Sequence, residues 1–141
     1  MRSISAHFRI ILEKILSMSY LIPSYGEHLI PISLAKEMIA RYASTKSTII
    51  APDYQNADIL ALNETFNADD VRLLLSQPNC VGFRIHYGMD DLNKIHSILV
   101  GVDHNGNDIT IKNPNLEHKV DGEFVIEEAV RCPPTCPPSN I

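Results

Sequence analysis

The dipeptide Asn105-Gly106 constrains the fold more than any other feature of this sequence, because it stands between two runs that are rich in β-branched residues. Asparagine and glycine both tolerate the positive φ angles that a two-residue type I′ hairpin turn requires. The predicted hairpin places Val102 opposite Ile109. Since side chains alternate along a strand, one face of the hairpin then carries a continuous apolar set, which we expect to belong to the core. This set consists of Ile98, Val100, Val102, Ile109 and Ile111.

The run just before this hairpin alternates apolar and polar side chains and predicts a third antiparallel strand. A slip of one residue would turn its apolar set to the wrong face, so the pattern favours pairing Phe83 with Ile98. Residues 80–111 therefore predict a three-stranded meander. In this register His96 points toward the core face and His86 away from it, which argues against a metal-binding pair of these two histidines.

Two helices are predicted before the meander. The first begins at Ser33, whose hydroxyl can cap the free amides of the first turn; the second follows Asn67, another capping residue, and ends before Pro78. Asp69 and Asp70 lie in the first turn of the second helix and complement the helix dipole, which explains this acidic pair without a catalytic role. The first helix carries an apolar stripe that we expect to be buried, formed by Leu34, Met38, Ile39 and Tyr42.

The predicted fold class is α+β, with two N-terminal helices packed on one face of an antiparallel meander sheet of about four strands. Residues 123–131 supply the fourth strand, although Glu127 and Glu128 also allow a short helix there. The chain then divides into three parts. These are an irregular or amphipathic N-terminal segment (1–31), a single α+β domain (32–131) and a tail rich in proline and cysteine (132–141).

The formal net charge of -5 over 141 residues, with no basic cluster, argues against a nucleic-acid partner, which requires a concentrated basic surface. Glu13 and Lys14 interrupt the apolar run near the N-terminus, so we predict neither a membrane-spanning helix nor a signal peptide. Three cysteines do not form the pattern of a secreted disulfide scaffold. We therefore expect a cytoplasmic protein without a membrane partner. Met1 and Met18 are equally good candidates for the true start of translation.

Three motifs occur together in this chain. They are the strand Cys-Val-Gly-Phe-Arg-Ile-His-Tyr-Gly, a hairpin with Asn-Gly-Asn-Asp, and a terminal Cys-Pro-Pro-Thr-Cys-Pro-Pro. In this combination the chain resembles a group of small bacterial proteins that carry no assigned function. The resemblance covers roughly residues 32–138. It implies a bacterial cytoplasmic protein and indicates no activity.

The predicted strand directions bring three cysteines and a histidine to one end of the sheet: Cys80, His104, Cys132 and Cys136. Three thiolates and an imidazole are a known ligand set for tetrahedral zinc, although Cys-x-x-x-Cys is not the usual ligand spacing. Cys80 also fits as a small buried residue, His104 as the flank of a turn, and the tail as a frayed end. A redox pair of Cys132 and Cys136, with Arg131 favouring the thiolate, is the alternative. The sequence specifies no cofactor, and zinc is the one that these residues allow.

A second group of candidate site residues is expected on the face of the meander away from the core. Arg84, His86 and Ser97 are predicted to lie together there, with Tyr87 above them. An arginine and a histidine can bind an anion, and a histidine can act as a general base near neutral pH. No nucleophile elbow, phosphate loop or dinucleotide motif accompanies them. Because Leu99 makes this face partly apolar, we favour a subunit contact or a small-ligand surface over an active site.

The function predicted from these patterns is that of a non-enzymatic cytoplasmic binding or interaction domain that forms a homo-oligomer or binds a protein partner. The first alternative is a metal-binding (zinc) or thiol-redox protein that uses the C-terminal cysteines. The second is a small enzyme that uses Arg84 and His86.

Overall fold

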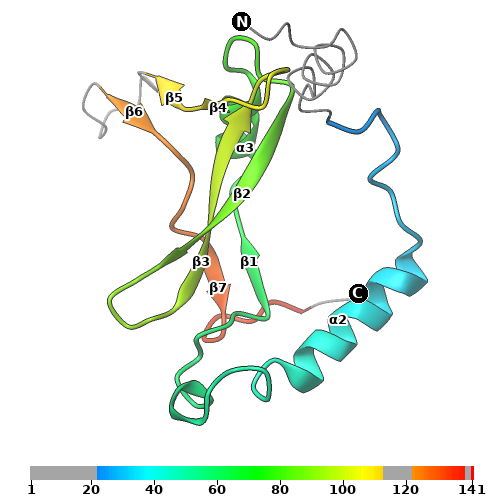
Figure 1. Ribbon diagram of the computed structural model, residues 1–141, viewed down its shortest axis with the longest axis vertical. Helices are drawn as coiled ribbons and strands as arrows, with labels where there is room; N and C mark the ends of the chain where they lie inside the picture. Colours follow the sequence, from blue (N-terminus) through cyan, green and yellow to red (C-terminus); the bar gives the residue numbers. More distant parts are fainter. Residues whose placement is uncertain (1–21, 113–121, 139–140) are drawn as a thin grey trace, which may run out of the picture.

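A long antiparallel hairpin forms the centre of the computed structural model, which describes residues 22–112, 122–138 and 141 (Figure 1). Strands β2 (Gly82–Met89) and β3 (Ile95–Val102) pair along their whole length, and β4 (Asp108–Ile109) joins the other edge of β3. The predicted meander is therefore present as an arrangement of strands. The predicted amphipathic segment at 1–21 and the choice between Met1 and Met18 lie outside the described residues.

The register of the hairpin differs from the predicted one. Phe83 lies opposite Gly101 instead of Ile98, a shift of three residues. Because the shift is odd, Phe83 and its apolar neighbours on β2 share a face with Leu99, while His86 shares the opposite face with Ile98 and Val100. The prediction that the apolar sets of the two strands lie on one face was wrong.

A short turn at the end of the hairpin explains this register. The Oδ1 atom of Asp90 accepts hydrogen bonds from the backbone amides of Leu92 and Lys94, both at 2.9 Å, and Asn93 takes a positive φ of 61°. These bonds let the strands pair as far as Met89 and Ile95. A prediction from the hydrophobic pattern alone does not take such hydrogen bonds between a side chain and the backbone into account.

The turn between β3 and β4 contains the expected Asn-Gly dipeptide but is one residue longer than predicted. The amide of Gly106 donates to the carbonyl of Asp103 at 3.0 Å, Gly106 has φ of 80°, and the amide of Asp103 donates to the carbonyl of Asn107 at 3.1 Å. This is a three-residue loop with a glycine bulge. Val102 consequently pairs with Asp108 instead of Ile109.

The rest of the chain forms two further small sheets in place of one four-stranded sheet. The predicted strand 123–131 is interrupted, and Glu128 inside it has a positive φ of 51°. Between its two ends, Ile126 forms an isolated bridge with Leu99. The two additional sheets pair β5 (Ile111–Lys112) with β6 (Glu123–Phe124), and β1 (Asn63–Thr65) with β7 (Val130–Cys132).

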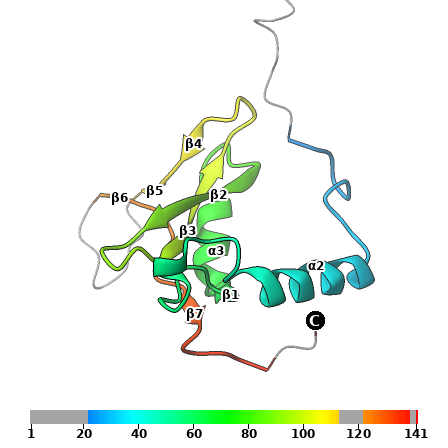
Figure 2. The ribbon, with the colours of Figure 1, turned by 60° about the horizontal axis from the view of Figure 1, so that its bottom comes forward.

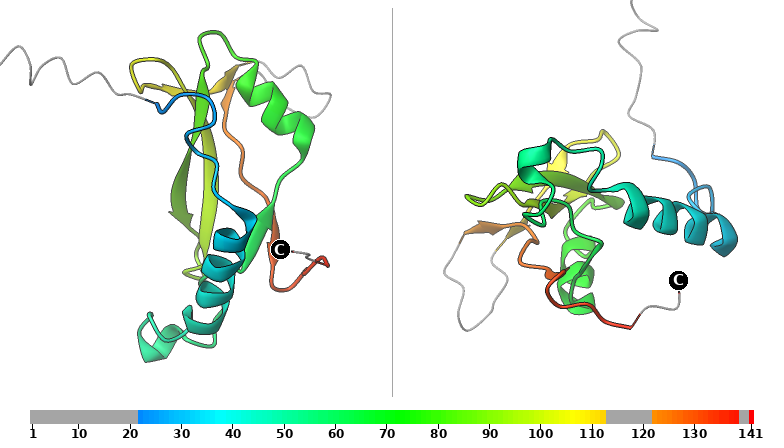
Figure 3. Two further views of the ribbon diagram at one scale, coloured as in Figure 1. Left: turned by 90° about the vertical axis from the view of Figure 1, so that its right-hand side faces the viewer. Right: turned by 90° about the horizontal axis from the view of Figure 1, so that it is seen from below.

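Helix α3 (Ala68–Leu75) covers one face of the hairpin, as Figures 2 and 3 show. The predicted cap is confirmed, because Oδ1 of Asn67 accepts a hydrogen bond from the amide of Asp69 at 2.7 Å. The fully buried Leu74 packs in a core cluster with Leu99 and two other buried side chains. Since α3 follows β1 in the chain, the expectation of two N-terminal helices was wrong. The other buried members of the cluster are Ile111 and Ile126.

Helix α2 (Ile32–Thr45) does not pack on the sheet and projects from the base of the fold (Figures 1 and 3). No residue of α2 is buried, and Met38, in the middle of the predicted stripe, is 53% exposed. Its C-terminal end is attached by two contacts: the hydroxyl of Tyr42 donates to the carbonyl of Ala61 at 2.7 Å, and Nζ of Lys46 donates to the carbonyl of Leu60 at 2.9 Å. After α2, the short 3-10 helix η1 (Pro52–Tyr54) leads toward β1. The predicted burial of the α2 stripe was wrong.

Candidate functional site

An apolar cleft of ≈ 480 Å³ lies between the hairpin, the segment around β1, the start of α3 and the end of α2. On the hairpin it is lined by the Leu99 face, where Phe83, Ile85 and Tyr87 are all exposed. Tyr42 contributes to the lining from α2. A contiguous group of exposed apolar side chains in a concave surface is a binding site more often than an ordinary part of the surface is.

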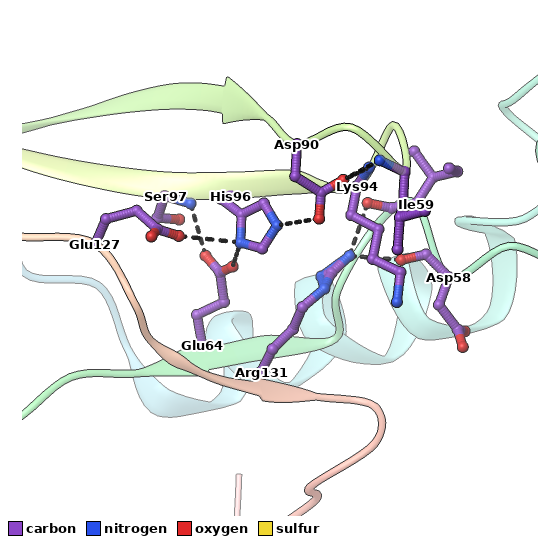
Figure 4. Close-up of polar contacts among 10 residues, drawn as sticks. Asp58, Ile59, Glu64, Asp90, Lys94, His96, Ser97, Glu127 and Arg131 are labelled. Carbon is purple, nitrogen blue, oxygen red and sulfur yellow. Dashed lines mark hydrogen bonds and ion pairs between the residues drawn. The ribbon is translucent and has the colours of Figure 1, made fainter.

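His96 lines this cleft from β3, and both of its ring nitrogens contact carboxylates (Figure 4). The Nε2 atom lies 3.0 Å from Oδ2 of Asp90 in the turn between β2 and β3. The Nδ1 atom lies 3.1 Å from Oε1 of Glu127, and 3.8 Å from Oε1 of Glu64 in β1. We call His96, Asp90, Glu127 and Glu64 the His96 cluster.

Glu64 is the most deeply buried acid of the His96 cluster, with 10% of its side chain exposed. Its Oε2 atom accepts a hydrogen bond from the amide of Ser97 at 2.9 Å, whereas its Oε1 atom is buried without a hydrogen-bond partner among the described residues. Arg131 lies opposite Glu64 in the β1–β7 pair. Its Nη2 atom donates to the carbonyls of Asp58 (2.5 Å) and Ile59 (2.8 Å), so it ties β7 to the loop before β1 (Figure 4).

Hydrogen bonds favour the charged form of Asp90. The amide of Lys94 has the largest effect and the neighbouring imidazole the next, and together they lower the pKa of Asp90 below its ordinary value. Burial raises the pKa of Tyr42, which the Glu64 carboxylate also raises and Arg131 partly offsets. The contacts that need a charged Asp90 therefore persist above the ordinary aspartate pKa and are lost only as the pH falls toward its lowered value.

Counting donors and acceptors indicates which form of His96 fits this cluster. A neutral imidazole has one N–H and can donate to one carboxylate, whereas an imidazolium can donate to Asp90 and at the same time form an ion pair with Glu127. Both nitrogens are engaged, so neither is left to bind a metal or to take a proton from a substrate. The arrangement suits a charged histidine that holds chain segments together.

The predicted group of Arg84, His86, Tyr87 and Ser97 is divided between the two faces of the hairpin. Arg84 and His86 both contact the carboxylate of Asp108 in β4, and Nη2 of Arg84 also donates to the carbonyl of Gly106 at 3.0 Å. Tyr87 and Ser97 face each other in the register and line the cleft instead. The three-residue shift of the hairpin is the reason for this division.

The predicted zinc ligands are not brought together. Cys80 and His104 flank the end of the hairpin near β4, whereas Cys132 belongs to β7 at the opposite end (Figure 1). Cys132 and Cys136 form a disulfide with each other, and Cys80 is a half-buried free thiol. Within the described part of the chain, no group of three or more His, Cys, Asp or Glu side chains is placed to hold a metal ion. The predicted geometry failed because β4 pairs with only two residues of β3, so the later segment bridges to β3 directly and continues to the far end.

Sequence reasoning missed the His96 cluster as a site. Its four residues come from β1, a turn, β3 and the stretch after Ile126, so no spacing in the sequence connects them. A correct register would have suggested that His96 lies near acidic residues, but the predicted register placed its side chain toward the core.

Comparison with known proteins gives no relative: no protein-family model matches the chain, and no curated protein or solved structure does. Among the described residues, no helix has the length and apolar character needed to cross a membrane.

Proposed function

We propose that this chain is a non-enzymatic interaction domain that self-associates, with helix α2 of one copy packing into the apolar cleft of a second copy. The single observation that carries the proposal is that one chain exposes both halves of such an interface. The stripe of α2 and the apolar wall of the cleft are each unpacked in the described structure. An amphipathic helix in an apolar groove is a common mode of protein recognition.

The geometry of α2 supports a reciprocal contact. Leu34, Met38 and Tyr42 are spaced four residues apart and therefore follow one side of the helix. The row starts in the cleft at Tyr42 and continues outward along α2 through two exposed side chains. Cleft and stripe thus form one continuous apolar surface. A surface of this kind can pair with its own copy about a two-fold axis, the commonest symmetry of homo-oligomers.

Charge complementarity supports a second copy as the occupant. Lys36 and Arg41 flank the stripe on α2, and neither side chain makes an ion pair within the described residues. Glu64 and His96 line the cleft, and Asp90 and Glu127 both contact His96. Basic flanks on the helix would therefore approach a cleft that carries acidic side chains, which favours this pairing over contact between two like surfaces.

The test is sedimentation velocity of the full chain over a range of protein concentrations. The proposal predicts a dimer at high concentration that dissociates on dilution. A monomer at every concentration would contradict it.

The disulfide favours a second candidate function, thiol–disulfide exchange. Cys136 is exposed, whereas Cys132 is 2% exposed in β7, so an external thiolate can reach only one sulfur. That thiolate would attack Sγ of Cys136, form a mixed disulfide there and release Cys132 as a thiolate. We propose a cytoplasmic location for the chain, and such a location would suit a reversible disulfide of this kind.

Incubation with reduced glutathione, followed by mass spectrometry of acid-quenched samples, tests this candidate. Exchange predicts a glutathione adduct on Cys136, and a Cys132→Ser variant should accumulate the same adduct when treated with glutathione disulfide. A disulfide that stays intact in millimolar glutathione would eliminate this function.

A further inference from the structure

The structure points to a proton-dependent clamp at the base of the cleft, and this inference rests on the proposed self-association. We propose that protonated His96 holds the β1–β7 sheet and the β2–β3 turn against β3, and that loss of this proton weakens the cleft and hence the dimer. His96 would thereby make self-association dependent on pH.

The segments that meet at His96 are joined by the His96 cluster and by backbone contacts, which include the Leu99–Ile126 bridge next to Glu127 and the hydrogen bonds within the β2–β3 turn. His96 is on β3, Asp90 in the β2–β3 turn, Glu64 on β1, and Glu127 in the stretch that leads to β7. Between the β1 side and β3, the structure adds the bond from the Ser97 amide to Glu64 and a 2.9 Å bond from the Ile95 amide to the carbonyl of Ile59. The His96 cluster therefore adds charged side-chain contacts to the backbone hydrogen bonds that join these segments beside the cleft.

Deprotonation of His96 turns one of these attractive contacts into a repulsive one. In a neutral imidazole, either the 3.0 Å contact with Asp90 or the 3.1 Å contact with Glu127 becomes a contact between two acceptors. The buried carboxylate of Glu64 also loses its nearest cation at 3.8 Å. A buried carboxylate that keeps only the Ser97 amide as a partner is less stable than one beside a cation, so the segments are expected to separate.

The other charged groups around His96 do not replace it. Arg131 donates from Nη2 to two backbone carbonyls, and among the described residues its buried Nε and Nη1 atoms have no hydrogen-bond partner and form no ion pair with Glu64; Lys94 contacts Asp90 through its backbone amide. The lowered pKa of Asp90 keeps this carboxylate ionised throughout the range in which histidine titrates. The charged or titratable groups on the elements packed around His96 are Tyr42 (α2), Glu64 (β1), Arg84, His86 and Tyr87 (β2), Asp90, Asp91 and Lys94 (turn), Glu127 and Glu128, and Arg131 (β7).

The direction of the effect follows from these contacts. The protonated form keeps the hydrogen bond to Asp90 and the ion pair with Glu127, so the clamp is complete at acidic pH and is lost as the pH rises.

The test compares full-length protein at about pH 5.5 and about pH 8, on either side of the ordinary histidine pKa. Sedimentation velocity gives the dimer dissociation constant, and urea unfolding at low protein concentration gives the stability of the single chain. We expect the dissociation constant to rise about tenfold at the higher pH, the effect of losing one charged hydrogen bond, and the urea midpoint to fall with it. The variant His96→Gln should remove both pH dependences, and His86→Gln, which removes a histidine that contacts Asp108 instead of the His96 cluster, should keep them.

Each outcome separates the clamp from the self-association. A monomer at all concentrations whose urea midpoint falls with pH only when His96 is present would retain the clamp and refute the dimer. A dimer whose dissociation constant and urea midpoint are equal at both pH values would refute the clamp. If His96→Gln does not fold, Asp90→Asn removes one carboxylate from an exposed position, and an unchanged pH dependence in that variant would also overturn the clamp.

Discussion

Replacing Leu74 with alanine is expected to lower the free energy of unfolding by about 2–5 kcal/mol, the range for removing a buried leucine side chain. Leu74 is fully buried between α3 and the hairpin and contacts the same cluster as Leu99, Ile111 and Ile126. The variant leaves a cavity in the apolar cluster that joins α3 to the strands. Urea unfolding monitored by far-UV circular dichroism measures the change.

The neighbouring leucine supplies the matched control. Leu75 is 41% exposed, so Leu75→Ala removes the same atoms from a partly solvated position and should cost less than about 1 kcal/mol. Equal losses for the two variants would contradict the assignment of the core to the Leu74 side of α3.

Replacing Met38 with glutamate is expected to weaken self-association by about 30-fold or more. This factor corresponds to about 2 kcal/mol, the usual threshold for an interface residue that dominates binding. The substitution would place a charge in the middle of the apolar stripe, where it would lose its hydration against Phe83 and Tyr87 of the other copy. Since Met38 is 53% exposed in the single chain, the stability of the monomer should change little. Sedimentation equilibrium gives the dissociation constant.

The control variant adds the same charge to the other side of the helix. Ala40 is exposed and lies away from the stripe, so Ala40→Glu should leave the dissociation constant within about twofold of the unmodified chain. A comparable loss in both variants would indicate a general charge effect and would refute the role of the stripe.

Local features of this fold could be predicted from the sequence because they depend on neighbouring residues. Asn67 caps α3 through an amide two positions away, and Gly106 takes the positive φ that a hairpin turn needs. The residues that form strands β2 and β3 also follow from their alternation. Each of these features is settled within a few positions of the chain.

The register could not be predicted because carboxylates fix it. Asp90 and Asp103 each bind backbone amides within their turns, and these bonds set where each strand begins to pair. The predicted pairing of Phe83 with Ile98 rested on apolar matching alone. The observed pairing is shifted from the predicted one by three residues, an odd number, so the side chains of β2 share faces with the other set of β3 side chains. This shift separates Arg84 and His86 from Ser97. It also explains why the contacts of His96 were not predicted.

The exposed stripe of α2 marks a different limit. Its periodicity correctly indicates an amphipathic helix, but a pattern within one element does not specify which surface will cover it. The expectation of burial assumed that the covering surface was the sheet of the same chain. The proposed dimer assigns that role to a second copy.

A mixing experiment with two defective variants tests the central claim most directly. Met38→Glu damages the helix and leaves the cleft intact, whereas Phe83→Glu damages the cleft and leaves the helix intact. Neither variant should dimerise alone. When they are mixed, one intact helix can enter one intact cleft, so sedimentation velocity with one fluorescently labelled variant should detect a heterodimer that is weaker than the unmodified dimer. A labelled variant that stays monomeric in the mixture, while the unmodified chain dimerises, would contradict the packing of α2 into the cleft.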